Sequence, residues 1–500
     1  MSARFLLGID IGTYSSKASL VREDGLVVAS DSVEHSLSLP HPGWAEHDPD
    51  AVWWKDFLHL CSTLLAATRV PSASIAAVGI STISPAVVIV DAAGKALRPA
   101  ILYGIDTRAT AEIAELERAT GATLSSQSAA PKVLWIRRNE PALWSKTRSV
   151  LNGSGYLNLR LTGERTIDVY DASIFAPFFD TEKLAWSERI APFVAPVEMM
   201  PRITWASEIA GRITASAARE TGLAEGTPVI TGTADAAAEA VSAGFAGPGD
   251  MMLMYGSSTF FILGTAALAA PRRFWGSRFL ERGSFVVAGG TATAGSLTRW
   301  FRDSFAPEER AAEARGEGNA YAGLASLAAS SPAGARGLVA LPYFSGERTP
   351  LSDPDARGML FGLTLGHSRA DVYRALLESV GYAIRHNVES LAADGCVARR
   401  ILAVGGGTEN PVWMQIVSDI AGLEQEIPAV LTGASYGDAF LAAMGVGMFS
   451  SLHDISRWVT GTRHVAPRAD ERLRYEASYR IYRELYERNA DLMHEIARLS

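Results

Sequence analysis

The segment FLLGIDIGTYSSKASLV, residues 5–21, decides the predicted fold. An apolar run ends in Asp10, a glycine and hydroxyl residues follow, and a second strand-like run begins at Lys17. We predict a hairpin whose turn binds phosphate, because Gly12 lets an anion approach backbone N–H groups, while Thr13, Ser15 and Ser16 add donors. Asp10 would hold a cation that neutralises phosphate charge. A buried strand followed by an ordinary polar turn explains the same pattern and stays open here.

Residues 251–263 repeat this plan, with a strand, the turn Gly256-Ser257-Ser258-Thr259 and a second strand. The repeat follows residues 244–250, a glycine- and proline-rich stretch that we interpret as a linker between domains. Two such halves imply a cleft between them, although two unrelated hairpins would look alike. The uncharged run 251–271 could be mistaken for a membrane span, but its polar turn favours two buried strands.

The length and composition predict a soluble, globular protein of more than one domain. Its 500 residues predict two or three domains, and 48% apolar with 20% charged residues is typical of globular proteins. The net charge of −8 argues against nucleic acid and anionic membranes as partners. Two cysteines, Cys61 and Cys396, offer no disulfide framework or zinc site. With no signal-peptide pattern at the N-terminus, we expect a cytoplasmic protein.

A second isolated carboxylate, Asp235, ends the strand-like run 228–235 and precedes a helical pattern. Such a group can act as a general base, or it can cap the helix that follows; it could also do both. The segment Gly433 to Gly437 matches the G-x-S-x-G pattern of hydrolases. We favour small residues packing at a helix start over a hydrolase nucleophile there.

Four motifs occur in a fixed order: Asp10-Ile11-Gly12-Thr13, Thr233-Ala234-Asp235, Ser345-Gly346-Glu347-Arg348-Thr349-Pro350 and Gly405-Gly406-Gly407. With them, the chain resembles the FGGY family of carbohydrate kinases from about residue 5 to residue 450, and most of all its xylulokinase-like branch. The resemblance implies an α/β fold with two ribonuclease-H-like (actin-like ATPase) domains and a cleft between them. We expect a sugar-binding and catalytic-base domain over 1–246, a nucleotide-binding domain over 250–450 and a helical extension over 451–500.

The resemblance also implies the reaction. The γ-phosphoryl group of ATP would pass, with Mg²⁺, to a hydroxyl of a sugar, a ketopentose such as xylulose. Glycerol, ribulose, erythritol or gluconate are alternative substrates, and a nucleotide-driven actin-like binding protein is the alternative class. We expect a small sugar or polyol and ATP as partners, and a homodimer is left open.

Matching positions give the site residues that the resemblance implies. Asp235 would be the catalytic base and would also contact substrate and metal, and Asp10 would hold the metal. The residues implied for phosphate and ATP are Gly12, Thr13, Lys17, Gly256, Ser257, Ser258, Gly295, Arg299, Gly405, Gly406 and Asn410. Those implied for the sugar are Trp44, Glu46 and Ser84. Three residues in family signatures are expected to be structural instead: Glu347, Arg348 and Glu378.

The chain departs from the family where the sugar is chosen. Xylulokinases commonly carry Gln-Met-His-Gly where this chain reads Ile83-Ser84-Pro85-Ala86, and Asn where it has Ala236. An imidazole and an amide that would bind sugar hydroxyls are therefore missing. Since a site built for hydrogen bonds discriminates by those bonds, D-xylulose as the specific substrate stays open.

Overall fold

The structure is a computed structural model that describes residues 3–269, 271, 273–429 and 432–499. Contacts divide the chain into two compact units. Unit 1 comprises Met1–Ala246, Ser277–Ser284 and Val430–Thr460, and unit 2 comprises Gly247–Gly276, Phe285–Ala429 and Gly461–Ser500. The division falls within the expected linker at 246/247, but segment 430–460 goes with unit 1, although we expected it in the C-terminal domain and extension. The predicted domain ranges and their roles stay predictions.

Unit 1 is built on a sheet with the strand order β13-β14-β5-β1-β2-β3, and β15 also pairs with β5. Its strands are β1 (Phe5–Ile11), β2 (Ser15–Arg22), β3 (Val27–Glu34), β5 (Ile75–Thr82), β13 (Ile209–Arg212), β14 (Pro228–Ile230) and β15 (Thr233–Ala234). The predicted opening hairpin is confirmed, because β1 and β2 are antiparallel with Asp10 opposite Lys17. β3 extends it into a meander, as the strand-like run 26–29 of the sequence also predicts. β1, β5 and β14 run parallel.

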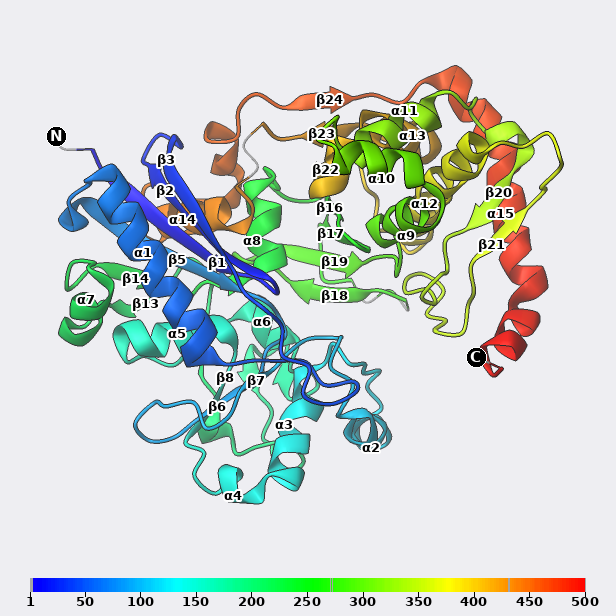
Figure 1. The fold of residues 1–500 in the computed structure, drawn as a ribbon. Coiled ribbons are helices and arrows are strands. Elements are labelled where there is room, and N and C mark those ends of the chain that lie inside the picture. The colour runs from blue at the N-terminus through cyan, green and yellow to red at the C-terminus, as the bar shows by residue number, and fades with distance from the viewer. Residues whose placement is uncertain (1–2, 270, 272, 430–431, 500) are drawn as a thin grey trace. The chain divides into compact units, whose positions relative to one another are not determined.

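Helices cover both faces of this sheet. On one face lie α1 (Lys55–Thr68), which follows the π-helical turn η1 (Pro49–Trp54), and α5 (Gly153–Thr162) (Figure 1). On the other face α14 (Ala434–Gly445) packs on β1 and β5 and contacts α8 (Asp235–Ser242). The alternation along β2 agrees: Ser16 bonds to Asp56 of α1, whereas Ser19 bonds to Ser435 of α14.

The rest of unit 1 forms a second apolar cluster around Trp135, Phe175 and Phe178. Its helices are α2 (Thr110–Thr120), α3 (Ala129–Asn139), α4 (Pro141–Trp144) and α6 (Val169–Ser173), whereas α7 (Ala215–Thr221) packs on α1 and belongs to the cluster of the main sheet. Short strand pairs brace them: β4 (Glu46–His47) with β7 (Ala100–Ile101), β6 (Val88–Val90) with β8 (Ser149–Leu151), β9 (Thr166–Asp168) with β12 (Arg202–Thr204), and β10 (Phe179–Asp180) with β11 (Ala185–Trp186). The sequence predicts strands at 86–90 and 100–103, where β6 and β7 lie, but only helices and loops over 132–220, because strands of two to four residues leave little periodicity.

Unit 2 repeats the strand plan in the order β18-β19-β17-β16-β22-β23-β24. Its strands are β16 (Asp250–Tyr255), β17 (Thr259–Thr265), β18 (Trp275–Arg278), β19 (Phe285–Gly289), β22 (Arg400–Val404), β23 (Gln425–Ile427) and β24 (Arg463–Val465). As in unit 1, an antiparallel meander (β16, β17, β19) is followed by two parallel strands (β22, β23). The predicted repeat is therefore real at the level of topology. The uncharged run forms β16 and β17, and Ala270 within it lies outside the described residues.

Apolar side chains of this sheet pack against helices of unit 2. These helices are α9 (Gly295–Phe305), α10 (Pro307–Ala314), α11 (Ala320–Ala329), α12 (Arg369–Ala393), α13 (Pro411–Ala421) and α15 (Ala469–Ala497), with the strand pair β20 (Val339–Leu341) and β21 (Met359–Phe361) beside them. Residues 306–336 are rich in Ala, Glu and Gly, a composition that predicts a surface excursion; α10 has no buried residue, whereas α11 buries Leu324 in the core. The predicted terminal helix is α15, which buries Tyr475 and Tyr482 in the core; Ser500 lies outside the described residues. None of the described helices is long and apolar enough to cross a membrane.

Candidate active site

The pairing of β1, β5 and β15 brings the two predicted carboxylates to one edge of the unit 1 sheet. Asp10 lies opposite Ser81 of β5, and Ser81 lies opposite Thr233 of β15. All three strands are parallel, so their carboxyl ends meet at the same edge. Asp235 follows β15 directly and begins α8. Ligands of open α/β sheets bind at such an edge, which makes it the candidate active site.

Helix α14 adds a third carboxylate that the sequence did not place here. A Cβ atom at Gly8 would lie 1.9 Å from the carbonyl oxygen of Ser435, and one at Gly79 would lie 2.0 Å from that of Asp438. Only glycine at these two positions lets the α14 backbone lie directly on β1 and β5. This contact brings Asp438 over Ser81.

Ser81 links two buried carboxyl groups. Its hydroxyl Oγ lies 2.7 Å from Oδ2 of Asp438 and 3.2 Å from Oδ1 of Asp10. The other oxygen of Asp438, Oδ1, is buried and has no hydrogen-bond partner among the described residues. Ser81 therefore fixes the orientation of Asp10, and Asp438 fixes Ser81.

Crowding of acids in unit 1 shifts their pKa values upward. Burial raises the pKa of Asp10 to about 6, against the opposing effects of Lys17, Ser81 and His35. Burial and the charge of Asp10 raise the pKa of Glu239 to about 7. The same two causes raise the pKa values of Asp235 and Asp438 well above the usual range. A bound cation would relieve this repulsion, so the electrostatics favour a metal ion or a cationic partner here.

The donor set suits a magnesium ion that keeps most of its water. Among the described residues, no three or more His, Cys, Asp or Glu side chains converge to hold a metal by themselves. Mg²⁺ needs only one or two carboxylates together with water and substrate phosphates. Asp10, with a hard oxygen ligand held by Ser81, fits that requirement.

The helix-cap alternative for Asp235 is wrong. The N-cap of α8 is Ala234, and no side chain caps the helix. Asp235 is the first helical residue, and its Oδ1 accepts a hydrogen bond of 2.7 Å from the backbone N–H of Ala236. As a whole residue Asp235 is half-buried, so it is not sealed in the core.

Hydrogen bonds from neighbouring residues hold the turn of the first hairpin. The N–H of Gly12 donates to the carbonyl of Ser15 at 3.0 Å, and Nε2 of His35 lies 3.1 Å from the carbonyl of Gly12. Thr13 Oγ1 lies 3.1 Å from the hydroxyl of Tyr103. We expected Ser16 as a phosphate donor, but its hydroxyl donates to Asp56 on the opposite face of the sheet, so that prediction is wrong.

The residues predicted for sugar already have partners in the structure. Oε1 of Glu46 accepts from Arg98 at 2.5 Å and lies 2.7 Å from Arg108. The guanidinium of Arg108 lies 3.8 Å from the ring centroid of Trp44 and also pairs with Asp106. A buried carboxylate needs such partners, so this cluster has a structural task whether or not it binds sugar. The sugar-binding roles of Trp44 and Glu46 stay predictions.

Ser84 belongs to a buried polar cluster that the sequence missed. Its hydroxyl donates to Oδ1 of Asp171 at 2.5 Å, and Asn152 donates to Oδ2 at 2.6 Å. The charge of Asp171 contributes to the raised pKa of Asp235, so the cluster lies near the predicted base. Other residues of the region that sequence reasoning did not assign to the site are Ser81, Glu239 and Asp438. A buried lysine, Lys132, lies instead beside Asp106 and Arg108, and its pKa is lowered to about 8 mainly by burial. Only Asp438 had a local signal, as the acid after the Gly433–Gly437 motif.

In unit 2 the second hairpin turn is held by the start of α9. The N–H of Gly295 donates to the carbonyl of Gly256 at 2.9 Å, and a Cβ at Gly295 would lie 2.5 Å from that oxygen. The backbone and hydroxyl of Ser296 both donate to the carbonyl of Ser257. Ser258 completes the turn, since its carbonyl accepts from the N–H of Gly256 at 3.0 Å.

The remaining predicted nucleotide residues follow β22 or lie on α9. Gly405 has a φ of 87°, and a Cβ there would lie 2.8 Å from the carbonyl of Tyr255. Gly406 faces open space, with nothing within 4 Å of an added Cβ. Oδ1 of Asn410 caps α13 by accepting from the N–H groups of Val412 and Trp413. Arg299 is exposed on α9.

The signature acids of unit 2 have structural partners. Glu347 accepts from the backbone N–H groups of Ala292 and Arg348, and burial raises its pKa to about 7. Glu378 is buried and pairs with Arg374 at 2.7 Å. These contacts agree with the structural roles that we expected.

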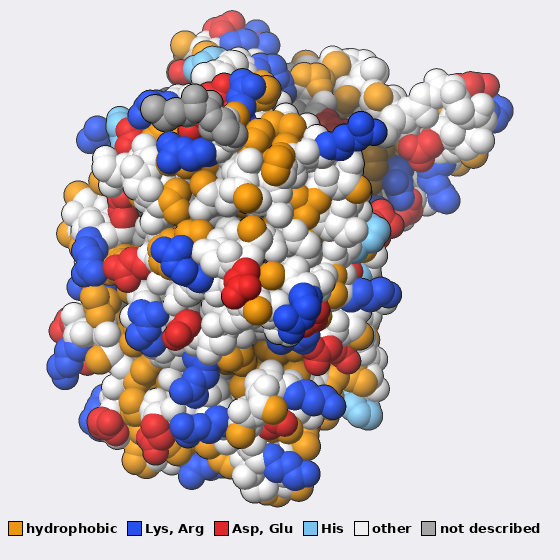
Figure 2. All heavy atoms as spheres, turned by 90° about the vertical axis from the view of Figure 1, so that its left-hand side faces the viewer, with side chains coloured by type: hydrophobic (Ala, Val, Ile, Leu, Met, Phe, Trp, Pro, Cys, Tyr) orange, Lys and Arg blue, Asp and Glu red, His pale blue; other side chains and the backbone are white. Residues whose placement is uncertain are grey.

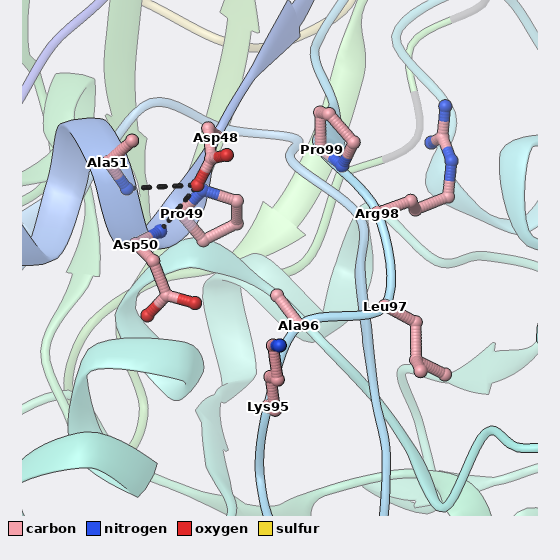
Figure 3. A pocket seen from close by; sticks show the side chains of 9 residues that line it. All are labelled: Asp48, Pro49, Asp50, Ala51, Lys95, Ala96, Leu97, Arg98 and Pro99. Carbon is pink, nitrogen blue, oxygen red and sulfur yellow. Dashed lines mark hydrogen bonds between the residues drawn. The ribbon is translucent and has the colours of Figure 1, made fainter.

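A pocket of unit 1 and one face of the molecule complete the description. A hollow of about 460 Å³ lies between residues 48–51 and 95–99; Asp48 caps the backbone of Asp50 and Ala51 at its rim, and none of the predicted site residues lines it (Figure 3). Figure 2 shows cationic and anionic side chains interspersed over the visible face.

The hydrolase alternative has no support at Ser435. This side chain is buried, and its hydroxyl bonds to Ser19 at 2.8 Å and to the carbonyl of Thr432 at 3.0 Å. The residue packs a helix start, as we favoured from the sequence.

Comparison with known proteins agrees with the fold. Sequence models of the FGGY family of carbohydrate kinases match residues 5–242 (N-terminal domain) and 251–446 (C-terminal domain). A xylulose kinase from Escherichia coli is 31% identical, covering 97% of this chain and 99% of the relative. A glycerol kinase from Symbiobacterium thermophilum is 30% identical, covering 94% and 96%. The crystal structure of a xylulose kinase from Rhodospirillum rubrum superposes with a TM-score of 0.89 at 34% identity, covering 98% and 100%.

Two sheets of one topology, one with carboxylates at its edge and one with a glycine-rich turn, define a phosphotransferase of the actin-like ATPase class. The chain belongs to the FGGY family of carbohydrate kinases.

Proposed function

We propose that this kinase transfers the γ-phosphoryl group of ATP to a hydroxyl of a ketopentose, with xylulose as the first candidate and Asp235 as general base. The observation that supports this best is the position of Asp235 at the sheet edge that also carries Asp10. The xylulose kinases from E. coli and R. rubrum support the choice of sugar.

In the proposed reaction the carboxylate of Asp235 accepts the proton of the attacking sugar hydroxyl. The hydroxyl oxygen forms a bond to the γ-phosphorus while the bond to the β,γ-bridging oxygen breaks, and ADP leaves with that electron pair. The raised pKa of Asp235 makes it a stronger base than an ordinary carboxylate, provided that it is ionised.

We further propose that Asp10, with Asp235 nearby, holds Mg²⁺ through water. The ion would neutralise charge on the phosphates. Asp10 is oriented for this by Ser81, and Lys17 lies directly across the hairpin from it. Gly12 and Thr13 would contact the transferring phosphate at the turn.

For the nucleotide we propose the backbone around two turns of unit 2. Gly256, Ser257, Ser258 and Gly295 would contact phosphate, and Gly405 and Gly406 would let backbone pass against it. Arg299 and Asn410 would contact the rest of the nucleotide. Since the side-chain oxygen of Asn410 caps α13, its amide nitrogen is the group we assign to the ligand.

For the sugar we propose Ser84, with Trp44 and Glu46 in the neighbouring loop. Ser84 brings Asp171 and Asn152 with it, which supplies an acid and an amide near the segment that lacks the usual imidazole. The glycerol kinase relative keeps glycerol and other polyols as the second candidates.

A coupled ADP-release assay tests the proposal with D-xylulose, D-ribulose, glycerol, erythritol and D-gluconate at equal ATP and Mg²⁺. We expect the highest kcat/KM with D-xylulose. A higher value with another acceptor would replace the sugar, and ADP release indifferent to all of them would contradict the kinase reaction. A homodimer and a cytoplasmic location stay predictions, to be checked by light scattering and by fractionation.

A further inference from the structure

Unit 2 contains a cavity of about 200 Å³ away from every residue assigned above. Its walls come from the segment before β18, the loop after β20, α12 and α15. The residues that line it are Arg273, Tyr343, Leu351, His386, Arg483, Tyr486 and Glu487. The lining therefore combines charged and polar side chains with the apolar Leu351 and the rings of two tyrosines.

Two arginines of this cavity stand without a carboxylate partner. Among the described residues no acid lies within ion-pair distance of Arg273 or Arg483, and Arg483 makes only a long hydrogen bond of 3.5 Å, to Tyr479. Other arginines of α15 behave differently, since Arg474 pairs with Glu471 and Arg480 with Glu484. Unpaired guanidinium groups beside a cavity are suited to bind an anion.

The nearby acids do not cancel this charge. Glu487 lines the cavity but is exposed and not within ion-pair distance of the described cations. Asp353 accepts hydrogen bonds from Tyr486 and His494, each at 2.8 Å, so this carboxylate already has partners other than the two arginines. The cavity therefore has a net positive lining.

The pKa of the buried His386 is affected by the positive charge of the same two arginines. Burial, followed by the charges of Arg483 and Arg273, lowers its pKa to about 3. The imidazole is therefore neutral and offers one N–H donor and one acceptor. A ligand that both accepts and donates hydrogen bonds, as a protonated phosphate does, would suit it.

We propose that this cavity binds a phosphate group, free or as a small monoester, through Arg273 and Arg483. Guanidinium forks match phosphate oxygens in geometry, and charge-assisted bonds of this kind are among the stronger hydrogen bonds. Pockets for drug-sized ligands span roughly 300–1,000 Å³, so the smaller cavity suits a phosphate with at most a short carbon chain. Leu351 and Tyr343 provide the wall against which such a chain would pack.

The site adjoins the loop between β20 and β21. Tyr343 and Leu351 flank Glu347, which holds the backbone N–H of Ala292 before α9. The ligand would thus contact the same loop that supports the start of the predicted nucleotide helix. The proposal itself concerns binding and does not depend on the sugar, the base or the reaction.

Isothermal titration calorimetry on the full chain tests it, with inorganic phosphate and glycerol 3-phosphate as probes at constant ionic strength. A saturating non-hydrolysable ATP analogue with Mg²⁺ fills the phosphate positions of the nucleotide site. We expect binding to weaken at least tenfold in Arg273→Gln and in Arg483→Gln, and less in Arg483→Lys, which keeps the charge. Arg480→Gln, on the same helix, is the matched control and should bind as the wild type does.

Tighter binding of glycerol 3-phosphate would identify the monoester as the ligand, and equal or tighter binding of inorganic phosphate would identify the free ion. No binding by the wild type, or equal binding by all four variants, would overturn the proposal. Melting temperatures without phosphate show that each variant is folded. Because no turnover is measured, failure here is distinct from failure of the kinase reaction.

Discussion

The two hairpins of this kinase have the same backbone plan and opposite chemistry. In β1–β2 the second-to-last residue pair before the turn is Asp10 opposite Lys17, whereas in β16–β17 it is Met254 opposite Phe260. The first hairpin therefore carries charged side chains next to its turn, whereas the second carries uncharged side chains there. One strand plan can therefore present either an acid for a cation or amide and carbonyl groups for a phosphate.

The neighbours of each hairpin extend the difference. Around the first, Ser81 and Asp438 orient Asp10 and add negative charge. Around the second, Gly295 and Gly405 bring backbone within contact of the strand end and its turn. The predictions below change one side of this comparison at a time, from the largest expected effect to the smallest.

Asp235→Asn should have the largest effect, because a positioned general base contributes about 10²–10⁴-fold. We expect kcat for sugar-dependent ADP release to fall by that factor while ATP binding, followed by calorimetry, is unchanged. Glu225→Gln removes an exposed carboxylate ten residues earlier in the chain and serves as the control. Turnover within threefold of wild type in Asp235→Asn would remove the role we give this residue.

Asp10→Asn should act on the metal rather than on the proton. We expect kcat to fall about 10- to 100-fold, with a higher Mg²⁺ concentration needed for half-maximal rate, because one hard oxygen ligand becomes an amide. A Mg²⁺ titration of the rate measures it, and Asp31→Asn on β3 is the matched control. An unchanged Mg²⁺ dependence would place the metal elsewhere.

Gly406→Ala tests the backbone side of the comparison. An added Cβ meets nothing within 4 Å, so the melting temperature should stay as in wild type. If phosphate passes here, the methyl group should raise KM for ATP about tenfold, the lower end of the effect of one misfitting carbon group. Gly366→Ala, where the nearest atom to an added Cβ is 3.6 Å away, should leave KM unchanged, and so would Gly406→Ala if no nucleotide approaches it.

The smallest effect concerns pH and stability. Glu239 has a folded-state pKa of about 7, above its usual 4.5, so the folded protein holds its proton more tightly than the unfolded chain between these values. Stability from this group is therefore present at low pH and is lost as pH rises from about 4.5 to 7. Glu239→Gln should remove that loss and gain on the order of 1 kcal/mol relative to wild type at pH 8, with no gain at pH 4. Denaturant unfolding at both pH values measures it, and an equal gain at both would contradict the assignment.

Local pattern predicted both hairpins, the meander and the helix after Asp235, because each depends on residues that are neighbours in sequence. It could not place Asp438, since the bond to Ser81 joins residues 357 positions apart. The partners of Glu46 were missed for the same reason, because Arg98 and Arg108 reach it from the loops before and after β7. The Ser16 prediction failed because the residue type shows what a side chain can bond to, but not which face of the sheet it occupies. The helix-cap prediction failed because the exact first residue of a helix cannot be read from the sequence.

The glycine contacts of α14 have a consequence for how the chain is made. Gly8 and Gly79 receive the backbone of residues 435 and 438, and Gly437 receives Ala238 of α8. During synthesis, α14 is made only after residues 247–429, most of which belong to unit 2. Until then, the face of the unit 1 sheet on which α14 packs lacks this helix. Chains normally complete N-terminal domains first, so this kinase would expose that apolar face for most of its translation and depend on late closure by α14.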